Sequence, residues 1–212
     1  MSPLSCLAAP EFRMADRLVL MDLELTCWQD NNLRTSWADP SRPPEVLEIG
    51  LVAYDLQSRA TLSTFSALVR PTLNPVLSDY CRNLVKVEQA EVAAASPLSE
   101  VAPRVTEWLD TLGRQDTVTC SWCTLDRVWL HDDAMRAGCA DPFEGRRHVN
   151  LSSLLLQALG DEPGPTPPRD AMTERLRLPP ILNRHRALAD AADLGRFCAL
   201  LTTTLSSEAR QC

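Results

Sequence analysis

The chain has 212 residues, of which 45% are hydrophobic, and its formal net charge is −7 at pH 7. This length and composition predict one soluble α/β domain with a sizeable core, and no apolar run approaches the roughly 20 residues of a membrane-spanning helix. The negative charge argues against a broad basic surface for binding nucleic acid.

The expected organisation is a leader or disordered N-terminus over residues 1–16, one domain over 17–206 and a short tail over 207–212. The first ten residues lack the basic start of a secretory signal. The eight cysteines are scattered, and several lie in apolar runs, which favours free buried thiols over disulfides. These features predict a cytoplasmic protein.

Residues 17–25 are predicted to form a buried strand that carries Asp22 and Glu24 inside an apolar run. Side chains two apart in a strand point to the same face, so the two carboxylates are expected to lie side by side. Buried like charges repel each other and lose their hydration, and a divalent cation would offset both effects. On these residues alone, two solvated acids at a strand end are the alternative.

The rest of the chain predicts further strands, followed by alternating helices and strands. The expected strands are residues 45–55, 60–69, 116–121 and 148–151, and the expected helices are 97–112, 124–137, a stretch reaching about residue 159, and 187–206. Residues 29–44 and 160–169, which are rich in proline and polar residues, are expected to be loops. This order predicts a mixed sheet flanked by helices in a single domain.

Three more ionisable residues complete a candidate site. Asp126 follows the strand 116–121, and His185 precedes Asp190 by five residues. Five residues correspond to about 140° around a helix, so we expect His185 on a loop or helix start and Asp190 in the first turns of the last helix. Four acids and one histidine suit two metal ions and a general base. For His185 alone, a solvated surface histidine is the alternative.

The order and spacing of these residues resemble a known family. The run Asp22-Leu23-Glu24-Leu25-Thr26-Cys27 is similar to an Asp-Phe-Glu-Ala-Thr-Cys motif of the DEDDh-type 3′–5′ exonucleases, which have an RNase H-like fold. The closest branch is the 3′ exoribonucleases that trim histone messenger RNA, small RNAs and ribosomal RNA. Further similar segments are 45–50, 69–84, 121–126 and 185–191, and the likeness covers about 17–203.

The resemblance implies a metal-dependent 3′–5′ exonuclease that releases 5′-mononucleotides from single-stranded or short 3′-overhang nucleic acid, with RNA favoured. It implies that Asp22, Glu24, Asp126 and Asp190 hold two Mg²⁺ or Mn²⁺ ions, and that His185 takes a proton from the attacking water. The expected partners are single-stranded RNA or DNA 3′ ends. A DNA-directed exonuclease and a catalytically silent nucleic-acid-binding relative are the alternatives.

The chain departs from this branch at a few positions. It reads Leu84-Val85-Lys86-Val87 where the branch usually has Leu-Thr-Gly-Ile. It also has Cys123 in place of a usual glycine and Ala189 where aspartate is frequent. None of these changes removes an expected metal ligand or the histidine, so they bear on substrate preference rather than on catalysis.

Other residues are candidates for substrate contact or support. Leu25 follows the acidic pair and is expected to pack against the terminal base, and Arg186 adjoins His185. Trp28 and Trp37 are candidates for stacking on unpaired bases, which aromatic side chains stabilise by roughly 1–3 kcal/mol per base. Glu48 lies in an apolar strand and is expected to support the metal ligands; a partly exposed strand acid is the alternative.

Overall fold

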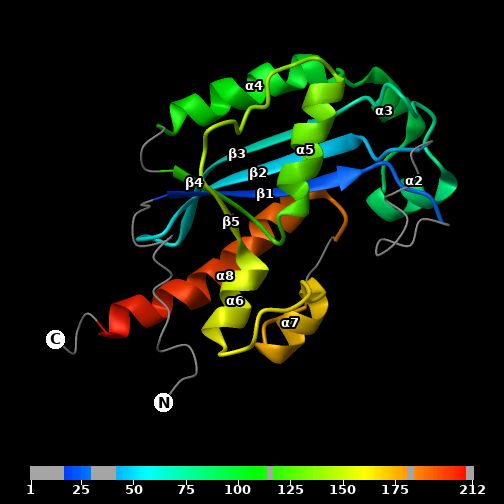
Figure 1. The fold of residues 1–212 in the computed structure, drawn as a ribbon. Helices are drawn as coiled ribbons and strands as arrows, with labels where there is room; N and C mark the ends of the chain where they lie inside the picture. The colour runs from blue at the N-terminus through cyan, green and yellow to red at the C-terminus, as the bar shows by residue number, and fades with distance from the viewer. Residues whose placement is uncertain (1–16, 30–41, 114–116, 181–183, 209–212) are drawn as a thin grey trace.

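The computed structural model describes residues 17–29, 42–113, 117–180 and 184–208, and contains one five-stranded sheet of order β3-β2-β1-β4-β5 (Figure 1). The strands are β1 (Arg17–Leu25), β2 (Val46–Asp55), β3 (Ala60–Leu68), β4 (Thr117–Ser121) and β5 (His148–Asn150). The first three strands pair antiparallel, whereas β4 pairs parallel with both β1 and β5. The predicted mixed sheet is therefore confirmed.

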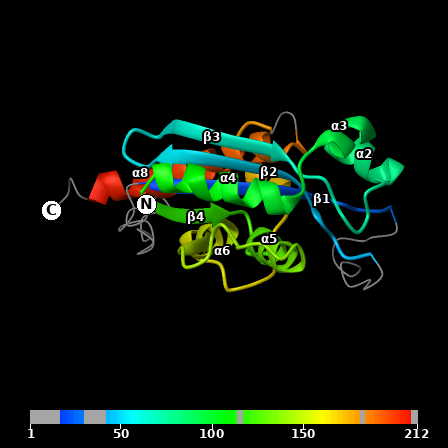
Figure 2. The same cartoon turned by 90° about the horizontal axis from the view of Figure 1, so that it is seen from above.

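Helices cover both faces of the sheet (Figures 1 and 2). They are α2 (Asp79–Val85), α3 (Gln89–Ala94), α4 (Leu98–Thr111), α5 (Leu125–Arg136), α6 (Leu151–Ala158), α7 (Arg169–Arg175) and α8 (Ala187–Glu208). The predicted strands and long helices lie within one or two residues of these bounds. The short helices α3 and α7 were not predicted, and α7 begins at Arg169, where a loop was expected.

Two hydrophobic cores show which way the residues of β1 point. Leu18 and Leu20 pack with side chains of α6 and α8, whereas Val19 and Met21 pack with α4 and α5. Strand side chains alternate between faces, which explains this separation. Residues 22 and 24 continue the series of Leu18 and Leu20, so their carboxylates lie on the side of the sheet that α8 covers.

Local capping explains several element boundaries. The Ser78 hydroxyl accepts a hydrogen bond from the Cys81 N–H (3.0 Å) at the start of α2. The Asn150 side chain accepts one from the Ser153 N–H (3.1 Å) at the start of α6. Each bond satisfies a backbone donor that has no partner inside the helix. Polar residues therefore set where these helices begin.

Gly50 allows α8 to approach the sheet closely. Gly50 pairs with Asp22 across the β1–β2 ladder. A Cβ atom at position 50 would lie only 2.1 Å from the carbonyl carbon of Ala187, the first residue of α8. Any side chain at position 50 would therefore push the start of α8 away from the acidic residues of β1.

As the sequence predicted, the six described cysteines form no disulfide: Cys27, Cys81, Cys120, Cys123, Cys139 and Cys198. Within the described ranges, no helix has both the length and the apolar character needed to cross a membrane. The expected N-terminal segment 1–16 and the loop residues 30–41 lie outside the described residues, as do 209–212 of the expected tail. The helix α8 continues through residues 207 and 208, where that tail was expected to begin.

Candidate metal centre and active site

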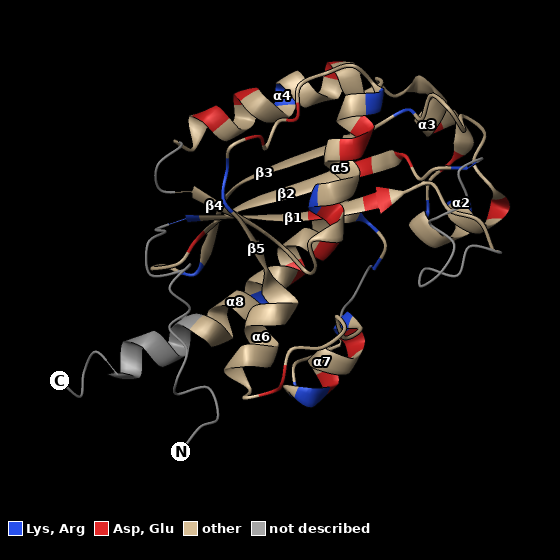
Figure 3. Cartoon of the chain, viewed as in Figure 1, with Lys and Arg blue, Asp and Glu red and all other residues tan. Residues whose placement is uncertain are grey.

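Three of the predicted acids meet where β1 ends and α8 begins. Asp22 and Glu24 come from β1 and Asp190 comes from the first turn of α8. All three residues are buried, and one ligand oxygen of each lies within 4.8 Å of the others. Figure 3 shows acidic segments of these elements gathered around the end of β1. Such a group of hard oxygen donors fits a divalent cation.

Burial makes this group electrostatically unfavourable unless a cation is near. Burial, followed by the charges of Asp22 and Asp190, raises the pKa of Glu24 from its ordinary value of 4.5 to about 9. Burial likewise raises the pKa of Asp22, and the positive charge of Arg169 opposes that shift. Both directions follow from moving like charges out of water and close together.

Asp126 lies beside the three acids but outside their compact group. It occupies the first turn of α5, and its negative charge contributes to the raised pKa of Asp22. Burial raises the pKa of Asp126 to about 6, while Arg169 and hydrogen bonds from its own N–H and that of Leu23 oppose the shift. The structure therefore brings the fourth predicted acid to the edge of the candidate metal centre.

Arg169, which the sequence analysis missed, lies between two of the acids. Its Nη2 donates to Asp22 Oδ1 at 2.6 Å and its Nη1 donates to Asp190 Oδ1 at 2.8 Å. The side chain is only 9% exposed, and its guanidinium lies 5.9 Å from the ring centroid of Trp122. A permanent cation thus contacts two proposed metal ligands and offsets part of their negative charge.

His185 is held next to Asp190 by its backbone. It lies at a bend two residues before α8, and its N–H donates to Asp190 Oδ2 at 2.7 Å. Its φ of 65° is in the left-handed region, which histidine adopts more readily than most residues. Burial, followed by the charge of Arg184, lowers the pKa of His185. The expected positions of His185 before the helix and Asp190 in its first turn are confirmed.

Glu48 anchors the start of α8. It is 2% exposed and accepts hydrogen bonds from Arg186 Nε (3.1 Å) and Nη2 (3.0 Å) and from the Ala187 N–H (3.2 Å). It also pairs with Glu24 across the ladder, and its charge contributes to the raised pKa of Glu24. Its predicted support of the metal ligands stays a prediction, and these contacts provide a physical route for it.

The remaining predicted contacts differ in exposure. Leu25 is 6% exposed and packs in the core on the α4 and α5 side, away from the carboxylates. Trp28 is partly exposed, and the guanidinium of Arg42 lies 5.3 Å from its ring centroid. Substrate contacts by Leu25, Trp28 and Arg186 stay predictions. Trp37 lies outside the described residues.

Comparison with protein families gives one match over most of the chain. A family model described as "Exonuclease" matches residues 19–196. The chain is 34% identical over 95 residues to ERI1 exoribonuclease 2 of Danio rerio and 28% identical over 150 residues to ERI1 exoribonuclease 3 of Homo sapiens. These alignments cover 45% and 67% of this chain but 16% and 41% of the relatives. The chain therefore spans less than half the length of these curated relatives.

Solved structures share the fold. The nuclease domain of 3′hExo, a DEDDh family member bound to rAMP, superimposes with a TM-score of 0.75 and 22% identity over 91% of this chain and 93% of that domain. A 3′-exonuclease from a structure of histone mRNA stem-loop recognition superimposes with a TM-score of 0.73 and 21% identity. The match covers 91% of this chain and 83% of that one. The sheet and helices therefore form the predicted RNase H-like fold.

The raised pKa of Glu24 predicts how stability depends on pH in EDTA. Glu24 binds a proton more tightly in the folded chain, so its contribution to stability is complete below pH 4.5 and is lost as pH rises through about 9. At pH 8, Glu24→Gln should raise the melting temperature, by roughly 2–4 °C for each kcal/mol recovered.

Differential scanning calorimetry at pH 5, 7 and 9 measures this effect. Glu107→Gln, on an exposed position of α4, is the matched control and should leave the melting temperature unchanged. A Glu24→Gln protein that melts at or below the wild-type temperature at pH 8 would contradict the electrostatic account.

Substitution of Arg169 should have the opposite effect on stability to substitution of Glu24. In EDTA, Arg169→Gln should lower the free energy of unfolding by about 3–5 kcal/mol, because it leaves buried carboxylates without their cation. Added Mg²⁺ or Mn²⁺ should recover much of this loss, since either ion supplies positive charge to the same oxygens. Urea denaturation with and without metal measures both effects.

Arg175→Gln is the matched control for Arg169. Arg175 lies on the same helix and forms an exposed ion pair with Asp161, so its loss should change stability by less than about 1 kcal/mol. Equal losses for the two variants, or an Arg169→Gln loss that metal does not reduce, would show that Arg169 does not serve as the counter-ion.

Proposed function

Because the chain belongs to the exonuclease family, we propose that it is a metal-dependent 3′–5′ exonuclease that acts on RNA ends. One observation carries the proposal. Three buried carboxylates converge within 4.8 Å, and the backbone of His185 is hydrogen-bonded to one of them. A protein that only binds nucleic acid has no physical use for a cluster that costs this much stability.

The acids fit magnesium or manganese. Asp22, Glu24 and Asp190 would hold the first ion, and Asp126 at the edge of the group would help to hold a second. When bound, such ions lower the pKa of a coordinated water and stabilise the leaving oxygen. Carboxylate oxygens are the ligands that both ions prefer, whereas the described residues near the site offer no cysteine-rich set typical of zinc.

The chain itself supplies the base and holds it in place. The lowered pKa of His185 leaves its imidazole neutral near pH 7, so a ring nitrogen is free to accept the proton of the attacking water. Asp190 fixes the backbone at His185, and Glu48 fixes the two residues that follow. The histidine is therefore positioned by contacts that do not use its ring.

The related proteins support RNA as the substrate. The curated relatives are named exoribonucleases, and one structural neighbour holds rAMP. The net charge of −7 favours binding of a short strand end over movement along a duplex. A DNA-directed exonuclease is the second candidate, because the same acids would cleave either phosphodiester. The free thiols favour a reducing compartment, and we propose the cytoplasm.

Digestion of end-labelled oligonucleotides tests the activity. A 5′-labelled single-stranded RNA with a free 3′-hydroxyl should shorten stepwise from its 3′ end in Mg²⁺ or Mn²⁺ and release 5′-mononucleotides. EDTA should stop the reaction, a 3′-phosphate should block it, and matched DNA should react more slowly. Rapid cutting of a circular RNA would indicate an endonuclease, and no turnover of any substrate would indicate a silent relative.

Substitution of His185 tests the proposed base. Asparagine tolerates the same left-handed backbone, so His185→Asn keeps the local fold and should lower kcat by about 10²–10⁴-fold. Calorimetric metal affinity should stay unchanged, because the acids hold the ions. The wild-type rate should fall only as pH drops below 6.5, the ordinary histidine pKa, because the pKa of His185 is lowered.

His131→Asn, which removes an exposed imidazole on α5, is the matched control and should keep full activity. Two results would remove His185 from the role of base. One is a His185→Asn enzyme with near wild-type kcat, and the other is a variant that loses metal binding together with activity.

A further inference from the structure

Lys86 occupies a backbone position that favours glycine. It ends helix α2 with φ 58° and ψ 47°, in the left-handed region, and its N–H donates to the Arg82 carbonyl oxygen (2.8 Å). A Cβ atom is sterically unfavourable in this conformation. This chain therefore carries a long cationic side chain at a strained backbone position. Strained backbone positions of this kind cluster at functional sites.

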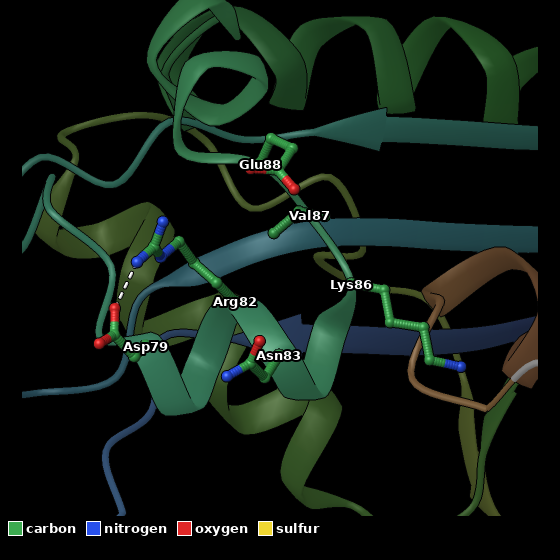
Figure 4. Close-up of a pocket in the computed structure, with 6 residues that line it drawn as sticks. All are labelled: Asp79, Arg82, Asn83, Lys86, Val87 and Glu88. Carbon is green, nitrogen blue, oxygen red and sulfur yellow. Dashed lines mark hydrogen bonds and ion pairs between the residues drawn. The ribbon is translucent and has the colours of Figure 1, made fainter.

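The Lys86 side chain extends toward the candidate active site. In Figure 4 it points away from Asp79, Arg82 and Glu88 and toward the segment that leads into α8. It lines a groove of about 660 Å³ between β3 and α8, together with Arg186 of the segment before α8 and Thr64 and Ser66 of β3. The Lys86 charge also contributes to the lowered pKa of His185. Lys86 therefore lines a groove beside the segment that carries the proposed base.

The other cations around the site already have carboxylate partners. Arg169 is paired with Asp22 and Asp190, Arg184 with Asp170, and Arg186 with Glu48. Lys86 is exposed, and among the residues that the structure describes no carboxylate lies within ion-pair distance of its ammonium group. Lys86 is thus able to bind an anion without breaking an existing ion pair.

The position of Lys86 relative to the acids indicates which phosphate it would meet. The groove that Lys86 lines includes Glu48 and Arg186 but none of Asp22, Glu24, Asp126 and Asp190. The phosphate to be cleaved has to lie at these acids, so the phosphate that Lys86 would meet in its groove is a neighbouring one. A flexible ammonium group suits a neighbouring backbone phosphate, because it binds charge without reading sequence.

We propose that Lys86 binds a backbone phosphate of the strand upstream of the cleaved nucleotide, and that it sets affinity for a strand rather than the rate of bond cleavage. This inference rests on the proposed exonuclease function. In a chain with a net charge of −7, the charge of Lys86 near the site should contribute strongly to affinity for a polyanion.

Lys86→Gly tests the proposal, because glycine removes the charge and also relieves the backbone strain, so the fold is kept. On a ten-nucleotide RNA, KM should rise about 5–20-fold with kcat within about twofold. The slope of log KM against log salt should decrease by about 0.7. On the p-nitrophenyl ester of uridine 5′-monophosphate, which lacks an upstream phosphate, kcat/KM should equal that of wild type.

Arg59→Gly is the matched control. Arg59 is exposed in the β2–β3 turn and has φ 56°, so the substitution removes one positive charge and one strained backbone position far from the acids. Both glycine variants should melt at or above the wild-type temperature, but only Lys86→Gly should raise KM for RNA. Lys86→Arg should restore most of the affinity.

Each other outcome overturns the proposal in a different way. Unchanged KM for RNA would show that Lys86 does not contact the strand. An equal loss on the mononucleotide ester would place Lys86 at the cleaved nucleotide, and a loss in kcat alone would place its effect on His185. If wild type hydrolyses neither substrate in Mg²⁺ or Mn²⁺, the exonuclease function fails and this inference fails with it.

Discussion

The rest of the site depends on the burial of three like-charged carboxylates within 4.8 Å of one another. Asp22 and Glu24 share a face because strand side chains alternate, and Asp190 faces them from α8. Such a group is stable only beside positive charge, and the guanidinium of Arg169 provides one such charge. The same requirement makes these oxygens a suitable site for divalent ions.

A second constraint is the close approach of α8 to β2. Gly50 leaves room for Ala187, and Glu48 binds the Ala187 N–H and the Arg186 side chain. These contacts join residues about 138 positions apart and place Asp190 over the end of β1. The exposed Lys86 lines a groove at this junction, together with Glu48 and Arg186.

Much of this arrangement was predictable from the sequence, because it follows from local patterns. The apolar run around Asp22 and Glu24 predicted a buried strand, and the five-residue spacing of His185 and Asp190 correctly placed the histidine before the helix. Arg169 was not predictable: it follows a proline-rich loop, and its partner Asp22 is 147 residues away. The contact of Glu48 with Arg186 was missed for the same reason, since periodicity carries no information on long-range pairing.

Calorimetric titration of Mn²⁺ tests the central claim most directly, namely that the three buried carboxylates form a cation site. Wild type should bind Mn²⁺, and Asp190→Asn should weaken that binding by about tenfold or more, because it removes a charged ligand. Asp193→Asn, three residues along the same helix and ion-paired with Arg196, should bind as wild type does. Equal affinities for wild type and Asp190→Asn would contradict the account.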